Sequence, residues 1–216
     1  MAVLFDLDGT ILGFYRDKSK VRNECARKYG VSEIAPEEYY YAMRKVIQNS
    51  KINDREPVFE QIVGDSKVAR KIAQDYEKRS LENSFVHEDA EEVLSGIKSK
   101  KGLVTNGPRS TQWRKIKKFD LEKYFDSVVV SGEVGKSKPG KEIFEIVLNN
   151  LESSPDESIY VGNVPELDVV GANNAGLVSV LINRECELCR GDNRKFNPKP
   201  DYEIRDLREL YGIVNS

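Results

Sequence analysis

The sequence predicts an α/β protein in which a doubly wound parallel sheet is interrupted near its N-terminus by a small all-helical domain. Two observations predict this fold class. From about His87 onward, short apolar runs typical of buried strands alternate with amphipathic stretches typical of helices. Before that point, the apolar run 2–5 is followed by residues 14–86, where no strand signal appears. We therefore expect one α/β domain, residues 1–13 and 87–216, with a helical domain, residues 14–86, inserted after the first strand.

The expected first strand ends at two carboxylates, Asp6 and Asp8. Gly9 and Thr10 follow them and favour a turn. Burying a carboxylate without a partner is unfavourable. Two acids two residues apart at the end of a buried strand therefore indicate a bound cation or a reaction, the alternative being an ordinary acidic loop.

Apolar residues recur at helical spacing throughout residues 14–86, which predicts four helices. Gly30 is expected to end the first helix, and Pro36, followed by two glutamates, to begin the second. Pro57 is expected to open the third helix and Asp65 to cap the fourth.

The remainder of the chain predicts further strands separated by helices. The strands are expected at 103–105, 128–130, 159–161, 178–182 and 202–204, and the helices at 88–101, 110–118, 141–151 and 167–175. In such a sheet, ligands bind beyond the carboxyl ends of the strands. Three of the expected strands end in polar groups: Asp6 with Asp8, Thr105 with Asn106, and Gly162 with Asn163.

Composition narrows the class of protein. The 216 residues are 39% apolar and 32% charged with a net charge of −2, and no basic stripe suggests a nucleic-acid partner. No apolar run approaches the length of a membrane span. The first strand begins at the N-terminus, so no signal peptide is expected, and three cysteines do not make a disulfide framework. We therefore expect a cytoplasmic protein without a membrane or nucleic-acid partner.

Four segments of the α/β part occur in a recognisable order: DLDGT from Asp6, LVTNG ending at Gly107, GKSKPGKEIF around Lys138, and GNVPELD from Gly162. Together they resemble the haloacid dehalogenase-like hydrolase superfamily. The helical block lies where this family places its C1 cap, and the ending KPDYEIRDLREL is similar to the family's usual ending. The resemblance implies a Rossmann-like core of this family in its C1-capped phosphatase branch.

The resemblance also implies roles for particular residues. Asp6 would be the nucleophile that forms an aspartyl-phosphate, and Asp8 would act as general acid and base. Thr105, supported by Asn106, would bind a phosphoryl oxygen, and Lys138 would neutralise charge on the transferring group. An aspartate at position 8 indicates a phosphatase, because family members that cleave carbon–halogen bonds lack it.

A magnesium site is implied by the same resemblance, with Asp6, Asp8, Asn163 and Asp168 as its ligands. Asp8 would contribute its backbone carbonyl. Asn163 departs from the family pattern, which has aspartate there. Because an amide brings no charge, we expect weaker Mg²⁺ affinity than in an Asn163→Asp variant, or a largely inactive protein.

The function expected from these residues is Mg²⁺-dependent hydrolysis of a small phosphorylated metabolite by a monomer or homodimer. A sugar-phosphate phosphomutase is the enzymatic alternative, since it uses the same intermediate. The alternative outside enzymes is a non-catalytic metabolite-binding protein, because Asn163 replaces the aspartate that the family has at this position.

Other signals have simpler interpretations. Cys186-x-x-Cys189 is half of a zinc site at most, since such sites need four ligands. His87 is expected at the surface near the hinge of the helical domain. Lys115, with Lys117 and Lys118, is expected to form a solvated helix face, although Arg109 and Arg114 nearby could contact an anionic substrate.

Overall fold

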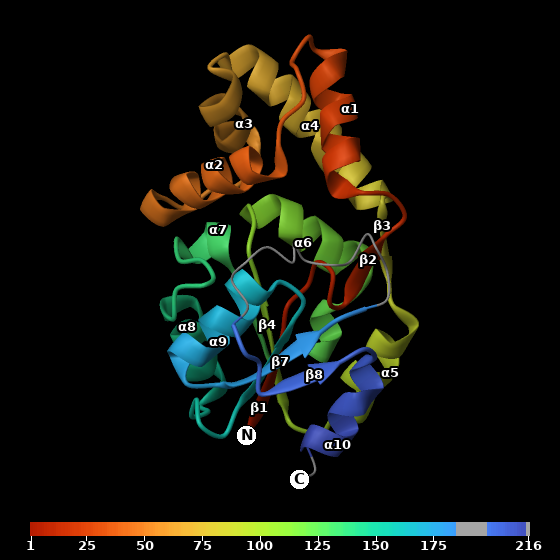
Figure 1. The fold of residues 1–216 in the computed structure, drawn as a ribbon, viewed down its shortest axis with the longest axis vertical. Coiled ribbons are helices and arrows are strands. Elements are labelled where there is room, and N and C mark those ends of the chain that lie inside the picture. Colours follow the sequence, from red (N-terminus) through yellow and green to blue (C-terminus); the bar gives the residue numbers. More distant parts are fainter. Residues whose placement is uncertain (185–197, 215–216) are drawn as a thin grey trace.

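The computed structural model describes residues 1–184 and 198–214, so the Cys186–Cys189 pair lies outside the described residues. Figure 1 shows a helical unit stacked on one end of an α/β unit, with both chain termini at the opposite end. Within the described ranges, no helix combines the length and the apolar character needed to cross a membrane.

A six-stranded parallel sheet forms the centre of the α/β unit, which confirms the predicted fold class. Its order is β5-β4-β1-β6-β7-β8, so that β1 lies inside the sheet although it comes first in the chain. The strands are β1 Ala2–Phe5, β4 Lys100–Thr105, β5 Ser127–Val130, β6 Ile159–Gly162, β7 Val178–Ile182 and β8 Tyr202–Ile204.

Helices cover both faces of this sheet, as Figure 1 shows. Because successive side chains of a strand point to opposite faces, β1 contributes Val3 and Phe5 to one core and Ala2 and Leu4 to the other. The first core is covered by α5 Glu88–Gly96, α6 Arg109–Lys118 and α10 Leu210–Val214, and the second by α8 Glu142–Leu151 and α9 Val170–Ala175. The short α7 Ser131–Val134 follows β5, and a π-helical turn, Pro165–Val169, leads into α9.

The helical unit consists of α1 Lys18–Lys28, α2 Pro36–Asn49, α3 Glu56–Val63 and α4 Ser66–Glu82. These four helices bury an apolar core of their own. Pro36 occupies the start of α2, and the Asp65 carboxylate caps α4 by accepting from the backbone N–H groups of Lys67 and Val68. The predicted helix starts are therefore confirmed.

Two strands at the ends of the insert correct the prediction that residues 14–86 lack strands. β2 Leu12–Phe14 and β3 Ser84–Val86 pair antiparallel, with Gly13 opposite Phe85. A Cβ on Gly13 would lie 2.4 Å from the Phe85 ring, so only glycine permits this approach. Three-residue strands are too short to give a periodic signal, and pairing across the insert forms them.

A second correction concerns the helix expected at 88–101. The helix α5 ends at Gly96, and β4 already begins at Lys100. Parallel pairing of β4 with β1 starts at Lys100 opposite Ala2. Hydrogen bonding to the central strand thus outweighs the helical propensity of these lysines.

His87 is the third correction, because it is partly buried where α5 begins. Its ring packs against Phe85 with the ring centroids 5.2 Å apart. Burial, together with the nearby Arg184, lowers the pKa of His87 to about 4, although Asp89 partly opposes the shift. His87 is therefore neutral at neutral pH.

Candidate active site

The two aspartates predicted as catalytic lie in the turn that follows β1. Asp6 is buried, with 5% of its surface exposed, and its backbone N–H donates to Val161 on the neighbouring strand β6. Gly9 has a φ of +101°, and a Cβ there would lie 2.3 Å from the Asn163 side chain. The turn is thus tight, and Asn163 from the end of β6 packs directly against it.

Lys138 is buried beside Asp6, although 132 positions separate the two residues in the chain. Its ammonium group lies 2.7 Å from Asp6 Oδ1, 2.7 Å from Asp168 Oδ1 and 2.7 Å from the Tyr160 hydroxyl. Tyr160 in turn donates to Asp168 Oδ1 over 2.9 Å. The three acceptors satisfy all three protons of the ammonium group.

Asn106 fixes the backbone from which Lys138 extends. Its side-chain amide donates to the Lys138 carbonyl over 3.0 Å, and its Oδ1 accepts from the Lys138 backbone N–H over 3.0 Å. Asn106 therefore connects the end of β4 to the loop that carries Lys138. The sequence pattern predicted that Asn106 supports Thr105, and it did not predict this contact with the Lys138 backbone.

The ionisation of this cluster follows from burial and charge. Burial raises the pKa of Asp6 to about 6, although Lys138 partly opposes the shift. Burial alone would lower the pKa of Lys138, but Asp168 and Asp6 raise it above its ordinary value. Lys138 is therefore protonated at neutral pH, and Asp6 is largely ionised.

A second ion pair holds Asp8. The Lys115 ammonium lies 2.8 Å from each carboxylate oxygen of Asp8. Gln112 donates through one amide nitrogen to Asp8 Oδ2 over 3.2 Å and to Thr105 Oγ1 over 2.6 Å. Burial would raise the pKa of Asp8, but Lys115 and Lys18 outweigh it and lower the pKa to about 2. Asp8 is therefore a carboxylate in this arrangement.

The burial of Lys115 corrects the prediction of a solvated face, which holds only for Lys117 and Lys118. Lys115 is 1% exposed, on the face of α6 that packs against the sheet. Gln112 lies three residues earlier on the same face. The spacing Gln-x-x-Lys, one turn after the Thr105 loop, is the signal that could have found both residues.

Both carboxylate oxygens of Asp168 accept hydrogen bonds from groups of the protein. Oδ1 accepts from Lys138 and Tyr160, and Oδ2 accepts from the backbone N–H of Val164 over 2.8 Å. Gly162 makes room for it, because a Cβ there would lie 2.3 Å from the Asp168 carboxyl carbon. Within the part of the chain that the structure describes, no group of three or more acidic, histidine or cysteine side chains is arranged to hold a metal.

The predicted site residues thus lie together at the carboxyl edge of the sheet. One network joins Asp6, Lys138 and Asp168, with Asn106 attached through the Lys138 backbone. A second network joins Asp8 to Thr105 through Gln112 and Lys115, and Asn163 contacts the turn between them.

The helical unit docks directly over this edge, above α6 and α7 in Figure 1. The backbone of Ile52 pairs with the core: its N–H donates to Gly132 over 2.8 Å, and its carbonyl accepts from Arg109 over 3.0 Å. A Cβ on Gly132 would lie 2.6 Å from the Ile52 carbonyl oxygen, so glycine is needed at this contact.

Glu77 of α4 adds a polar contact between the two units. It accepts from the Thr111 hydroxyl over 2.7 Å and from the Arg114 guanidinium over 2.9 Å. A cavity of about 180 Å³ lies beside this contact and has both Glu77 and Arg114 in its wall. Arg114 is therefore held by a carboxylate of the helical unit, and Arg109 by Glu133.

The raised pKa of Asp6 predicts a pH dependence of stability. A carboxyl whose pKa rises from about 3.8 to about 6 on folding contributes stability below about pH 4 that is lost as the pH rises through about 6. We expect the unfolding free energy of the protein to fall by up to roughly 3 kcal/mol between about pH 4 and pH 6, relative to that of an Asp6→Asn variant. Both proteins are measured in EDTA. Urea unfolding at several pH values measures this difference. Parallel pH profiles for the two proteins would contradict the expectation.

Comparisons with known proteins agree with this geometry. The family model described as haloacid dehalogenase-like hydrolase matches residues 3–182. A relative from Methanothermobacter thermautotrophicus, named glyceraldehyde 3-phosphate phosphatase, is 30% identical, and the match covers 99% of each chain. N-acylneuraminate-9-phosphatase from Homo sapiens is 28% identical over 100% of this chain and 94% of its own. The crystal structure of a HAD phosphatase from Thermococcus onnurineus is 30% identical with a TM-score of 0.66, over 99% and 97% of the two chains.

A family match over residues 3–182, together with a full-length relative at 30% identity, identifies the class of protein. The chain belongs to the haloacid dehalogenase-like hydrolase superfamily. Its relatives named above are phosphatases, and the chain is a phosphoric monoester hydrolase.

Proposed function

We propose that this chain hydrolyses a small phosphorylated metabolite in a Mg²⁺-dependent reaction that passes through a phosphorylated Asp6. The observation that carries the proposal is the buried Asp6 carboxylate at the end of β1, 2.7 Å from the Lys138 ammonium. Burial favours the protonated form of Asp6, and the fixed Lys138 cation opposes this effect, so that Asp6 is largely ionised at neutral pH, as a nucleophile must be.

In the first step, an Asp6 oxygen forms a bond to phosphorus while the bond to the leaving oxygen breaks, and Asp8 donates a proton to that oxygen. In the second step, Asp8 removes a proton from water, which attacks phosphorus and releases Asp6 and inorganic phosphate. Lys115 keeps Asp8 ionised here, so proton donation requires the negative charge of a bound phosphoryl group to raise the pKa of Asp8.

The remaining residues would hold the phosphoryl group. Thr105 Oγ1, which accepts from Gln112, can turn its own hydroxyl proton toward a phosphoryl oxygen. Lys138 would neutralise the charge that gathers on the transferring group. Asn106 acts through Lys138, because it fixes the backbone of that residue.

Mg²⁺ supplies charge neutralisation and alignment of the phosphoryl group when it is bound. The oxygen donors available to it fit its chemistry. They are the Asp6 carboxylate, whose Oδ1 is the oxygen paired with Lys138, the Asp8 backbone carbonyl and the Asn163 side chain beside Gly9. Asp168 was predicted as a fourth ligand, but both of its oxygens accept hydrogen bonds from the protein, which favours a role in orienting Lys138.

Replacing Asn163 with aspartate is expected to lower the Mg²⁺ concentration that gives half-maximal activity, because a carboxylate adds a charge to the site. The change is isosteric, so the contact with Gly9 is retained. Titration of Mg²⁺ against phosphate release in both proteins measures the effect. Equal half-saturation values would contradict it.

The helical unit would act as a C1-type cap that closes over the metabolite and excludes bulk water. We propose the division at residues 13 and 87, where β2 and β3 carry the chain out of the α/β unit and back. The Ile52 and Glu77 contacts described above support a closed arrangement.

The test is phosphate release from p-nitrophenyl phosphate with Mg²⁺ and with EDTA. Release that requires Mg²⁺ supports the proposal. Retention of the phosphoryl group on an isomerised sugar phosphate, without free phosphate, would favour the phosphomutase instead. Absence of turnover with intact binding of phosphorylated compounds would favour the non-catalytic alternative.

A further inference from the structure

The side-chain amide of Gln112 lies between Asp8 and Thr105. Gln112 is 1% exposed and lies on the buried face of α6. Its Nε2 donates to Asp8 Oδ2 over 3.2 Å and to Thr105 Oγ1 over 2.6 Å. Its Oε1 accepts from the Lys115 ammonium over 3.3 Å. One buried amide therefore contacts both the proposed general acid and the proposed phosphoryl-binding hydroxyl.

The neighbours of this amide fix which end carries the oxygen and which the nitrogen. An ammonium group only donates hydrogen bonds, and an ionised carboxylate only accepts them. The amide oxygen must therefore face Lys115, and the amide nitrogen must face Asp8. The reverse orientation would place two acceptors together at Asp8 and two donors together at Lys115, and two buried hydrogen bonds would be lost.

This orientation determines where the hydroxyl proton of Thr105 can point. An amide nitrogen carries two protons, and here one is directed at Asp8 Oδ2 and the other at Thr105 Oγ1. Because Thr105 Oγ1 accepts from Gln112, the proton of the Thr105 hydroxyl must point elsewhere. Among residues 1–184 and 198–214, no protein group accepts that proton. The hydroxyl is therefore available to donate to a bound phosphoryl oxygen.

The turn that precedes α6 holds the Gln112 side chain in place. Gly107 has a φ of +147°, and a Cβ there would lie 3.0 Å from Gln112 Cδ, so the amide packs directly against this backbone. The backbone N–H of Gln112 donates to the Pro108 carbonyl over 3.1 Å. On its other side α6 contacts the helical unit, as Figure 1 shows. The amide therefore has little room to turn away from Asp8 and Thr105.

We propose that Gln112 is a positioning residue for the transfer of the phosphoryl group. Its amide holds the Asp8 carboxyl group where the leaving oxygen takes up a proton, and it directs the Thr105 hydroxyl proton toward a phosphoryl oxygen. The inference rests on the proposed function and adds a residue to the same site. The alternative is a purely structural role, in which Gln112 only satisfies the hydrogen bonds of the buried pair of Asp8 and Lys115.

Gln112→Met tests the contact with Asp8, because methionine keeps the length of the side chain but cannot donate. p-Nitrophenolate leaves without a proton, whereas the alkoxide that leaves benzyl phosphate needs one, and general acid catalysis is typically worth about 10²–10⁴-fold. We therefore expect kcat/KM for benzyl phosphate to fall about 10- to 100-fold further than kcat/KM for p-nitrophenyl phosphate. A purely structural role predicts an equal fall for both substrates.

Gln61→Met is the matched control, since Gln61 is exposed on α3 and loses the same amide. It is expected to leave both kcat/KM values unchanged. The ratio of the two kcat/KM values within one variant does not depend on how much of the protein is folded. A loss of stability in Gln112→Met therefore cannot by itself produce the difference between the two substrates.

Gln112→Glu tests the contact with Thr105, with inorganic phosphate as the ligand in the presence of Mg²⁺. A carboxylate beside the Lys115 ammonium accepts but does not donate, so the Thr105 hydroxyl is expected to turn toward it and away from the phosphate. Calorimetry on the four combinations of Gln112→Glu and Thr105→Val separates this effect from that of the added charge. We expect Gln112→Glu to weaken phosphate binding about 10-fold more when Thr105 is present than in the Thr105→Val background, on the scale of a hydrogen bond to a charged group.

The two assays separate this inference from the proposed function. Coupling between Thr105 and Gln112 in phosphate binding supports the inference even if no substrate is turned over. An equal fall of kcat/KM for both substrates, or additive effects of the two substitutions on phosphate binding, would overturn the inference while the proposed function stands. Absence of turnover together with absence of phosphate binding would overturn both.

Discussion

Replacing Asp6 with asparagine is expected to reduce phosphate release by a factor on the order of 10⁴ to 10⁶, which is the scale on which enzymes lose activity with their nucleophile. An amide cannot form the acyl phosphate, and no other described carboxylate lies in its place: Asp8 is paired with Lys115 and Asp168 with Lys138. Asparagine keeps the shape of the side chain, so the turn against Asn163 is expected to remain.

Steady-state assays with p-nitrophenyl phosphate measure this loss. Acid quenching with a labelled substrate is expected to trap label on the wild-type chain and none on Asp6→Asn. Matched urea unfolding at about pH 7 verifies that the variant is folded. Equal activity of the two proteins, at equal stability, would eliminate the role assigned to Asp6.

Replacing Lys138 with methionine is expected to have two large effects. The rate should fall by about 10² to 10³, the usual cost of losing a preorganised group that stabilises charge in a transition state. Stability should fall by roughly 3–5 kcal/mol, because Asp6 and Asp168 would stay buried without their common cation. Methionine retains the length and apolar stem, so a cavity contributes little.

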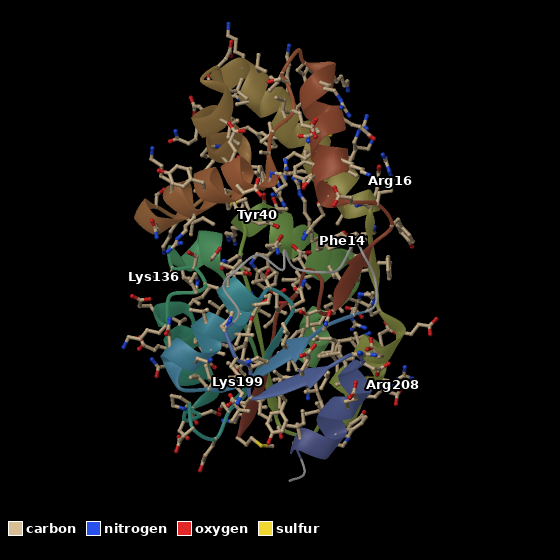
Figure 2. All side chains as sticks on the ribbon, viewed as in Figure 1. Phe14, Arg16, Tyr40, Lys136, Lys199 and Arg208 are labelled. Carbon is tan, nitrogen blue, oxygen red and sulfur yellow. The ribbon has the colours of Figure 1, made fainter. Side chains whose placement is uncertain are left out.

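Lys136→Met is the matched control, since Lys136 is exposed two residues earlier in the same loop and lies on the surface in Figure 2. It should change neither the rate nor the urea midpoint. Kinetics must be measured without denaturant, at a temperature well below the unfolding transition of both variants. A stable Lys138→Met protein with unchanged kcat would refute the assigned role.

The layered fold could be derived from the chain because its signals are local. The apolar run Ala2–Phe5 is buried on both faces, and the alternation of strands and helices after His87 requires parallel pairing. Helix starts at Pro36 and Asp65 could be read from single residues, since a missing N–H and a capping carboxylate act within one turn.

The strands β2 and β3 could not be derived in this way. Each has three residues, and the two become adjacent only because the helical unit returns the chain to its starting point. The same holds for Lys100, whose helical preference gives way to pairing with Ala2. Non-local hydrogen bonds decide such segments.

What the sequence by itself determined is the set of polar groups that meet at one edge of the sheet: Asp6, Asp8, Thr105 and Lys138, each set by the strand or loop that carries it. Only the tertiary structure decided their partners. It assigned Lys115 to Asp8, although a lysine-rich helix is usually solvated, and it placed Lys138 between two carboxylates, Asp6 and Asp168. The physical reason is that the cost of burying a charge depends on groups distant in the chain, which the local sequence does not specify.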